Sequence, residues 1–331
     1  MGSAWIVIVN YRTAELAIDC LRALSSQKTD LGGGRVLVID NDSGDGSVDY
    51  LNSAIERENW LDWAGVMPLD HNGGFAFGNN AGIRAALSSA NHVDYVMLLN
   101  PDTVARPNAV KSLIEFMDAH PKVGIAGSLL ENTEGGVECS AHCMHSPLSE
   151  LESGARLGFL SRLLYRYRVS PPPSGETHSC DWVSGASMIV RRAAIERVGQ
   201  MDDGYFLYFE EVDFCWRIKR AGWEVWYVPQ SRVMHLEGAS TGIRVKAKRR
   251  AKYWYDSRRR FFVKHYGVIG LVAADMLWAL GRSTLLLRRL LGLGGGSGED
   301  DPTWFMADLL WGDLKALLTG KVWRIRQGQA H

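Results

Sequence analysis

Polar side chains that could bind a metal and a diphosphate follow a short apolar run in the first third of the chain. The run is Tyr95–Leu99, and Asn100-Pro101-Asp102 comes directly after it. The run predicts a buried strand, and Pro101 ends it because proline cannot donate to a sheet. Asp102 is therefore expected at the carboxyl end of a strand, where open α/β sheets bind ligands and where a carboxylate suits a hard divalent cation. A simple turn is the alternative, since Asn and Asp beside proline often form turns.

Three carboxylates within four residues, Glu210, Glu211 and Asp213, form a second candidate site. They follow the aromatic run Tyr205–Phe209 and precede an amphipathic helical pattern. Carboxylates in an aromatic setting can have raised pKa values and act as general bases. Acidic residues are also favoured in the first turn of a helix for purely structural reasons, so both interpretations stay open.

Two further segments bring polar groups toward the same edge of the expected sheet. The strand 35–39 runs into the acidic turn Asp40–Gly46, and the glycine-rich loop His71–Asn80 leads into a helix. Glycine lets the backbone approach a ligand, and a helix N-terminus attracts phosphate. The loop matches neither a P-loop nor G-x-G-x-x-G. The acidic turn, the glycine-rich loop and Asp102 are therefore expected at one edge of the sheet, where together they could bind a nucleotide.

Later segments add two more candidates. Residues 181–190 predict a strand in which Gly185 indicates either close approach of the backbone to a ligand or a bulge. Residues 223–228 predict a strand that Pro229 ends, and His235 closes the next strand-like run. A lone histidine is more often structural, but His235 and Asp102 both end strands and are expected to reach one crevice.

The order of elements and the composition limit the class of protein. Strands and helices alternate over the first 120 residues, which predicts a mostly parallel sheet with helices on both faces. Residues 130–180 form a long irregular stretch with one helical pattern at 157–167, either an acceptor-binding lid or a disordered insert. Zero net charge over 331 residues argues against a nucleic-acid partner. Five scattered cysteines without C-x-x-C, and an N-terminus without signal-peptide features, favour a cytoplasmic protein.

The C-terminal part of the chain is basic and then amphipathic. Residues 244–264 contain ten lysines and arginines among aromatic residues. Such a segment could bind a diphosphate or an anionic membrane surface, or could be a basic helix exposed to water. The apolar stretch 268–280 is interrupted by Asp275 and is shorter than a membrane span. Residues 266–326 fit peripheral membrane contact, and packing on the protein or on a second subunit, as in a homodimer, is the alternative.

In combination these stretches resemble the family 2 glycosyltransferases with the GT-A fold, and among them the bacterial rhamnosyltransferases of polysaccharide assembly. The matching segments, in the family's order, are 9–11, 40–43, 72–76, 78–80, 100–102, 182–186, 209–217 and His235. The resemblance implies an α/β fold, a Rossmann-like mixed sheet with helices on both faces and a helical C-terminal extension. Residues 1–128 would form the nucleotide-sugar half, 129–240 the acceptor and catalytic half, and 241–331 the basic helical region.

The resemblance also implies roles for individual residues. Asp102 and His235 would bind Mg²⁺ or Mn²⁺, and Asn100 stands where the family has the first acid of Asp-x-Asp. Glu211 falls at the position of the general base, with Asp213 and Glu210 as alternatives. The donor-binding residues would be Asn10, Asp40, Asp42, Asn72, Gly73, Asn79, Asn100 and Arg258. The acceptor-binding residues would be Trp182 and Gly185.

The reaction implied is inverting transfer of L-rhamnose from dTDP-rhamnose to a lipid-linked or polysaccharide acceptor at the inner face of the plasma membrane. A UDP-linked donor of another sugar is an alternative. A non-catalytic protein that binds nucleotide sugars or glycans is another, supported only by Asn100 in place of an acid. A dehydrogenase is disfavoured because G-x-G-x-x-G does not follow the first strand.

Overall fold

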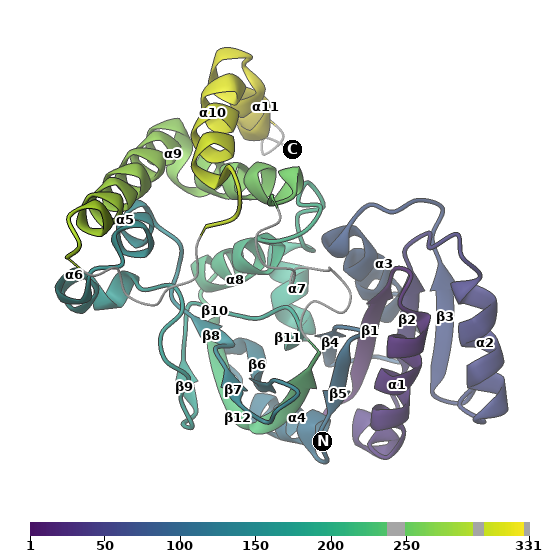
Figure 1. The fold of residues 1–331 in the computed structure, drawn as a ribbon. Helices are drawn as coiled ribbons and strands as arrows, with labels where there is room; N and C mark the ends of the chain where they lie inside the picture. The colour runs from purple at the N-terminus through teal and green to yellow at the C-terminus, as the bar shows by residue number, and fades with distance from the viewer. Residues whose placement is uncertain (237–248, 294–300, 328–331) are drawn as a thin grey trace. The chain divides into compact units, whose positions relative to one another are not determined.

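The computed structural model describes residues 1–236, 249–293 and 301–327, so part of the basic segment, 244–248, lies outside the described residues. The chain divides into two compact units (Figure 1). The first comprises Met1–His142, Pro172–Phe206 and Glu210–Arg244, and the second comprises Cys143–Pro171, Leu207–Phe209 and Val245–His331. Residues 143–171 join the C-terminal helices in the second unit, because helix α5 (Pro147–Ala155) packs along helix α9 (Lys252–Leu290).

The first unit is built on one mixed sheet of strand order β3-β2-β1-β4-β11-β6-β12-β5. The four strands β3, β2, β1 and β4 are parallel, whereas β11 runs antiparallel to both of its neighbours. The main strands are β1 (Ala4–Asn10), β2 (Val36–Asp40), β3 (Ala64–Pro68), β4 (Tyr95–Leu99), β5 (Thr103–Ala105), β6 (Val123–Glu131), β11 (Ser187–Arg191) and β12 (Glu224–His235). Short strands β7 (Val137–Glu138) and β9 (His178–Ser179) join the sheet, and β8 (Ala141–His142) pairs with β10 (Trp182–Val183).

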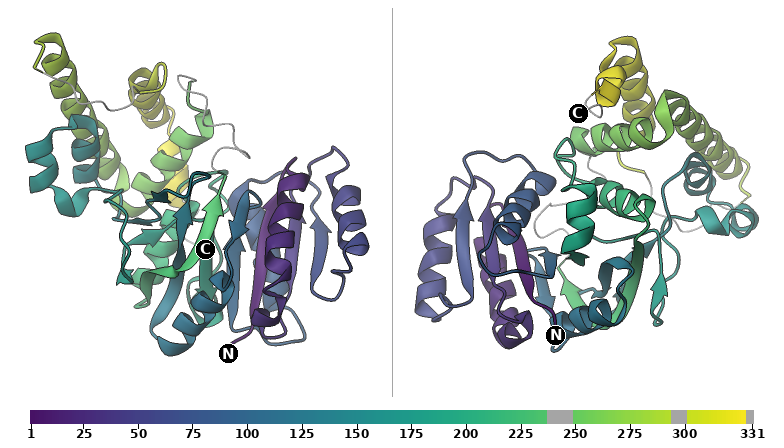
Figure 2. Two further views of the ribbon diagram at one scale, coloured as in Figure 1. Left: turned by 60° about the horizontal axis from the view of Figure 1, so that its bottom comes forward. Right: turned by 180° about the vertical axis from the view of Figure 1, so that it is seen from behind.

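Helices cover both faces of this sheet, as expected (Figure 2). One face packs on α1 (Ala14–Ser25), α2 (Ser47–Arg57) and α4 (Ala109–Ala119), and the other on α3 (Phe75–Leu87). Helices α7 (Arg192–Val198) and α8 (Glu210–Arg220) contact β11, β6 and β12. Helix α3 lies so close to β1 that a Cβ at Gly78 or Gly82 would come within 2.8 or 2.3 Å of a valine side chain of that strand. Glycine at these two positions allows the close packing.

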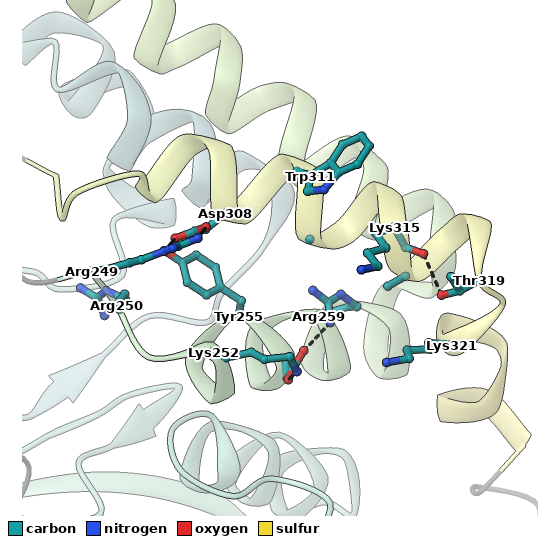
Figure 3. A pocket seen from close by; sticks show the side chains of 13 residues that line it. Arg249, Arg250, Lys252, Tyr255, Arg259, Asp308, Trp311, Lys315, Thr319 and Lys321 are labelled. Carbon is teal, nitrogen blue, oxygen red and sulfur yellow. Dashed lines mark hydrogen bonds and ion pairs between the residues drawn. The ribbon is translucent and has the colours of Figure 1, made fainter.

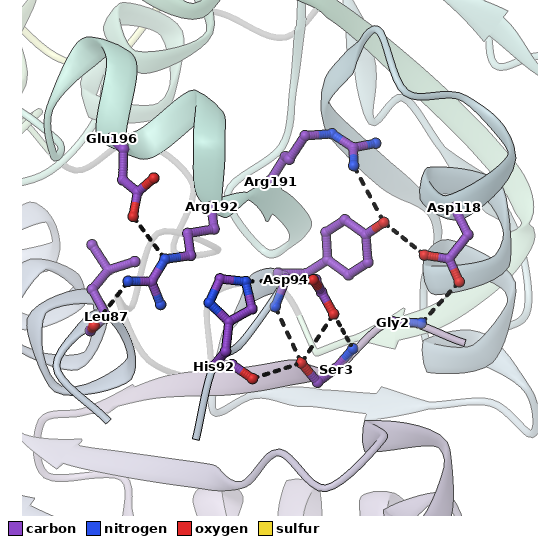
Figure 4. A network of polar contacts seen from close by, with 10 residues as sticks. Gly2, Ser3, Leu87, His92, Asp94, Asp118, Arg191, Arg192 and Glu196 are labelled. Atoms are coloured by element: carbon purple, nitrogen blue, oxygen red, sulfur yellow. Dashed lines mark hydrogen bonds and ion pairs between the residues drawn. The ribbon is translucent and has the colours of Figure 1, made fainter. Parts of the chain in front are cut away.

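A polar network at the amino end of β1 fixes the strand register far from the carboxyl ends of the strands (Figure 4). The Gly2 amide donates to Asp118 at 2.9 Å, and the Ser3 amide donates to Asp94 at 2.8 Å. The Tyr95 hydroxyl also donates to Asp118, at 2.7 Å. These bonds join β1, β4 and α4, so the opposite ends of the strands are presented in a defined alignment.

The carboxyl ends of the parallel strands gather the candidate residues at one edge. Asn10 at the end of β1 pairs with Asp40 at the end of β2, and Ile8 of β1 pairs with Leu99 of β4. Since β11 is antiparallel to β4, its first residue Ser187 lies opposite Leu99, and the turn before it reaches the same edge.

Several expected elements differ from the observed ones. Residues 181–190 form two strands, β10 and β11, so Gly185 lies in the turn between them and not inside a strand. Pro229 does not end its strand: β12 continues to His235 across a register shift between Val228 and Arg232, which accommodates a residue that cannot donate. The helical pattern at 157–167 is split into α6 (Gly158–Leu163) and the 3₁₀ turn Tyr165–Tyr167. Strand β3 has no counterpart among the expected elements.

The second unit is helical, with α5, α6, α9, α10 (Phe305–Leu318) and α11 (Lys321–Gln327). Helix α9 contains a break at Gly267, where φ is +71°. By length and composition α9 is apolar enough to cross a membrane, with 33% of its most apolar stretch buried in the protein. Its interior also contains a buried ion-pair network: the Arg258 guanidinium contacts Glu150, Asp275 and Asp313.

Candidate active site

The turn after β2 is held by a buried carboxylate. Asp40 is 2% exposed and accepts hydrogen bonds from the Asn10 amide at 2.7 Å and from the Ser43 hydroxyl at 2.6 Å. Its second oxygen accepts from the Ser43 backbone N–H at 3.0 Å. Asp42, in contrast, is exposed and adopts a φ of +58°. Asp40 therefore shapes the turn, while Asp42 presents its carboxylate to solvent.

The glycine-rich loop is tied to this turn by Asn41, a residue that the sequence analysis did not single out. The Asn41 amide donates to the Asn72 side-chain oxygen at 2.9 Å and to the Gly74 carbonyl at 3.0 Å. The same Asn72 oxygen accepts the Gly74 N–H at 3.0 Å. Gly73 lies so close to the Phe77 ring that a Cβ added at Gly73 would come within 2.4 Å of the ring. The loop is thus fixed against the end of β2.

The start of α3 is bound to the segment that precedes α8. The Phe75 N–H donates to the Phe206 carbonyl at 2.8 Å. Gly74 has a φ of +90°, and a Cβ there would lie 2.0 Å from that carbonyl oxygen, so only glycine fits. Asn79 donates to the Phe75 carbonyl at 3.0 Å within the helix. Asn80, also not singled out, exchanges two hydrogen bonds with the Met201 backbone, at 2.8 and 3.0 Å.

Asp102 and His235 are brought together by the pairing of β5 with β12, in which His235 lies opposite Thr103. The His235 Nε2 lies 3.4 Å from Asp102 Oδ1 and 3.5 Å from the Asn100 amide nitrogen. Asp102 is 1% exposed. The buried atoms Asn100 Oδ1 and His235 Nδ1 have no hydrogen-bond partner within the described residues.

These residues fit a divalent cation in the chemistry of their donor atoms. A carboxylate and an amide oxygen are ligands for Mg²⁺ and Mn²⁺, and imidazole is the commonest nitrogen ligand of protein metals. Within residues 1–236, 249–293 and 301–327 there is no cluster of three or more His, Cys, Asp or Glu side chains that could hold a metal. Among the described residues, the Asn100 amide oxygen is a candidate third ligand, because it is buried and has no hydrogen-bond partner there.

Glu211 is the second residue of α8 and is partly exposed, although one of its carboxylate oxygens is buried. Burial raises the pKa of Glu211 to about 7, although the backbone N–H groups of Glu211 and Val212 at the helix start oppose this. Its Oε2 is buried and has no hydrogen-bond partner among the described residues. A Cβ on Gly185 would lie 3.6 Å from Glu211 Cβ and 3.4 Å from the Phe75 ring. Gly185, in the turn before β11, thus lies beside both Glu211 at the start of α8 and Phe75 at the start of α3.

The other two carboxylates are placed differently. Asp213 is completely buried and accepts a hydrogen bond from Arg217 Nε at 2.8 Å. Arg217 also donates to the carbonyls of Val198 and Gln200, at 3.0 and 2.7 Å. Asp213 therefore anchors Arg217 and the chain before residue 201. Glu210 is also buried.

The remaining predicted residues lie in well-packed surroundings. Trp182 stacks on His142 with ring centroids 3.9 Å apart and an interplanar angle of 13°. Arg258 belongs to the second unit, where it is 1% exposed. Its guanidinium contacts three carboxylates there, so its charge is neutralised within the protein.

Solved structures share the fold of the whole chain. GalNAc-T7 with UDP, GalNAc and Mn²⁺ aligns with a TM-score of 0.55 at 14% identity, over 96% of this chain and 58% of that one. The mannosyltransferase PcManGT from Pyrobaculum calidifontis, in complex with GDP-Man and Mn²⁺, aligns with a TM-score of 0.52 at 15% identity, over 96% and 81%. The fold is GT-A, as expected.

Sequence comparison then gives the family. Residues 4–255 match the model of the "Glycosyltransferase like family 2", and the chain belongs to this family. It is 33% identical over 153 residues to the N-acetylglucosaminyl-diphospho-decaprenol L-rhamnosyltransferase of Mycobacterium tuberculosis. This alignment covers 45% of this chain and 49% of that protein. It is 25% identical over 167 residues to the rhamnosyltransferase WbbL of Escherichia coli K12, over 49% and 61%. The chain thus matches about half the length of the mycobacterial relative.

Proposed function

We propose that the protein is an inverting glycosyltransferase that moves a sugar from a nucleoside diphosphate to a hydroxyl group of a glycan acceptor. The observation that carries this proposal is the position of Glu211. Its carboxyl has a pKa of about 7, and the residue lies beside Gly185, which is also next to the Phe75 ring at the start of α3. A group with that pKa can accept a proton at neutral pH.

In the proposed reaction, Glu211 takes the proton of the acceptor hydroxyl while the oxygen attacks the anomeric carbon. The bond to the diphosphate breaks in the same step, so the configuration at that carbon inverts. Asp102, His235 and Asn100 would hold Mg²⁺ or Mn²⁺, which neutralises charge on the departing diphosphate when bound. Asp213 would position α8 through Arg217 and not accept the proton, since its carboxylate is already paired.

For the donor we propose dTDP-rhamnose, with a UDP-linked sugar as the alternative. The names of the mycobacterial and E. coli relatives support rhamnose, and UDP in the GalNAc-T7 structure supports the alternative. Asp42 and the loop residues Asn72 and Gly73 would face the nucleotide sugar, with Asn10, Asp40 and Asn79 holding these segments in place. Trp182 and Gly185 would line the acceptor side.

We further propose that the acceptor is a polyprenyl-linked glycan and that the protein works at the inner face of the plasma membrane. The name of the mycobacterial relative, a transferase acting on a diphospho-decaprenol, supports this. Exposed apolar side chains on one side of α9, including Ile269, Met276, Leu280 and Leu287, support peripheral membrane contact. The same side chains would alternatively form the contact of a homodimer, which light scattering of the purified protein distinguishes.

The test is release of nucleoside diphosphate from dTDP-rhamnose and from UDP-sugars, with Mn²⁺ and a polyprenyl-diphosphate-linked acceptor. Turnover by the wild type and its loss in Glu211→Gln support the proposal. A matched control is Glu196→Gln, which removes an exposed carboxylate of the same unit. A protein that binds the nucleotide sugar but shows no turnover with any of these pairs would be the non-catalytic binding protein, the candidate that Asn100 favours.

A further inference from the structure

The backbone adopts a strained conformation immediately before the helix that carries Glu211. Tyr208 and Phe209 have φ angles of +71° and +69°, and Phe209 directly precedes Glu210, the first residue of α8. Residues other than glycine rarely adopt a positive φ, because their Cβ then crowds the backbone. Two such residues in succession, both with large aromatic side chains, persist only where their surroundings hold them.

The sequence at this helix start supplies no local reason for the conformation. Helices usually begin after Ser, Thr, Asp or Asn, whose side chain accepts a hydrogen bond from a backbone N–H of the first turn. Phe209 stands at that position and has no side-chain oxygen. Contacts from other parts of the chain must therefore hold the start of α8, and with it the residue that carries the proposed reaction.

An aromatic cluster of the second unit, to which residues 207–209 belong, surrounds the Phe209 side chain. Phe209 is 5% exposed. The centroid of its ring lies 4.9 Å from that of His145, 5.6 Å from that of Phe261 and 6.0 Å from that of Trp254. These three rings confine the Phe209 ring, so rotation of the backbone at this residue would have to displace a packed side chain.

Two further contacts hold the residues before Phe209. The hydroxyl of the buried Ser257 donates to the Leu207 carbonyl at 3.0 Å. The Tyr208 ring stacks on Tyr253, with centroids 6.1 Å apart and an interplanar angle of 24°. Both partners lie in the first two turns of α9. One helix thus contacts each of residues 207, 208 and 209.

The start of α9 is in turn fixed against α10. Arg249 pairs with Asp308, and Arg259 pairs with Asp313 at 2.5 Å. Figure 3 shows the pair of Arg249 and Asp308 at one end of a groove of about 580 Å³ that residues of α9 and α10 line. The support for residues 207–209 is therefore a packed pair of helices.

We propose that Phe209 is a positioning residue for Glu211. Its ring, confined by the aromatic cluster, keeps Tyr208 and Phe209 at positive φ and so sets the direction in which the first turn of α8 presents the Glu211 carboxylate. The inference rests on the proposed function, because Glu211 is the base of that reaction.

The experiment compares Phe209→Ala with Phe209→Leu and with Phe305→Ala. Alanine removes the confined ring, so residue 209 can leave the positive φ and the first turn of α8 can shift. We expect kcat to fall about 10- to 100-fold, as it does when a reacting group moves by about 1 Å, and the donor KM to stay unchanged. Leucine keeps an apolar side chain in the cluster and should restore most of kcat. Phe305 also packs on three aromatic rings of this unit, and its loss should leave kcat unchanged.

Titration of the Glu211 carboxyl by carbon-13 NMR measures the same movement without any substrate. Its resonance is the one that Glu211→Gln lacks. It should titrate near pH 7 in the wild type and in Phe305→Ala, and closer to pH 4.5 in Phe209→Ala, because a displaced carboxyl regains water. Burial raises the pKa of Cys215, one turn further along α8, to about 12, so this thiol stays neutral throughout the titration.

Ser257→Ala is a milder variant for the case that Phe209→Ala does not fold, which thermal unfolding shows. It removes only the hydrogen bond to the Leu207 carbonyl and should lower kcat and the pKa of Glu211 in the same direction by a smaller amount. Wild-type kcat and titration in both variants, or in Ser257→Ala alone where Phe209→Ala is unfolded, would overturn the proposal. Equal changes in Phe305→Ala would overturn it as well.

The two measurements also separate this inference from the proposed function. If the wild type turns over no donor but the pKa of Glu211 falls in Phe209→Ala, the proposed transfer is wrong and the positioning role stands. If the wild type turns over a donor and neither kcat nor the titration changes in Phe209→Ala, the proposed transfer stands and the positioning role is wrong.

Discussion

Replacing Glu211 by glutamine should slow transfer by about 10²- to 10⁴-fold and stabilise the protein at the same time. The pKa of this carboxyl is raised by burial from its ordinary value of 4.5 to about 7. One pKa unit is worth about 1.4 kcal/mol, so holding the ionised carboxylate in the native site costs about 3 kcal/mol. Glutamine has nearly the same shape and no charge, and it removes this cost together with the base.

The sign of the effect follows from which form the native state favours. Below pH 4.5 the carboxyl is protonated in both the native and the unfolded states, so the variant and the wild type should be about equally stable. Between pH 4.5 and about 7 the unfolded state ionises first, and the wild type loses stability relative to the variant. Above pH 7 the variant should be more stable by about 3 kcal/mol.

Activity should show the opposite dependence. The rate of transfer by the wild type should rise about tenfold per pH unit up to about pH 7 and then level off, because only the ionised carboxylate accepts a proton. Loss of a general base lowers kcat by about 10²- to 10⁴-fold. Urea unfolding at pH 4.5 and pH 8, together with release of nucleoside diphosphate, measures both effects in Glu211→Gln and in the exposed control Glu196→Gln.

Two results would refute this reasoning in different ways. Full activity of Glu211→Gln would show that another group accepts the proton. A stability difference that does not change between pH 4.5 and pH 8 would show that the carboxylate is not desolvated in the native protein.

Three other substitutions test separate contacts. Gly74→Ala should destabilise the protein by about 2 kcal/mol or more in urea unfolding, because the new Cβ meets the Phe206 carbonyl as well as a positive φ; Gly46→Ala, with a similar φ and open space around it, should cost about 1 kcal/mol. Asp102→Asn should weaken Mn²⁺ binding at least tenfold by calorimetry without lowering the thermal midpoint, and unchanged affinity would exclude Asp102 as a ligand. Arg258→Met should cost about 3–5 kcal/mol, since Glu150 and Asp275 lose this cation and Asp313 keeps only Arg259, and an unchanged melting curve would contradict the network.

The sequence predicted those parts of the fold that local pattern determines. The parallel strands β1, β2 and β4 and the helices after them were expected, because continuous apolar runs and helical periodicity are properties of short segments. The meeting of Asp102 with His235 was expected from strand ends and is observed at 3.4 Å. Strand β3 was not predicted, because only Ala64 of its five residues is buried and the segment has little apolar pattern.

Contacts between distant segments were not predictable in this way. The bonds of Asn80 to Met201 and of Phe75 to Phe206 join residues more than 120 positions apart, and no local pattern signals them. Pro229 was expected to end a strand, but a register shift between Val228 and Arg232 accommodates this proline and lets β12 continue. Arg258 was predicted to bind the donor because it lies in a basic segment, but its charge is neutralised by carboxylates from three other parts of the chain.

The arrangement around Arg258 also sets an order of events during synthesis. Glu150 precedes this arginine by 108 residues, and Asp275 and Asp313 follow it by 17 and 55. The strands of the first unit are therefore synthesised before Asp313, the last of these acids. The second unit can bury Arg258 with all three partners only after α10 has left the ribosome. A chain interrupted before that point lacks Asp313, so Arg258 keeps only Glu150 and Asp275 and the network is incomplete. Premature termination in the last helices should thus yield a protein that retains its sheet and is recognised by proteases through its helical unit.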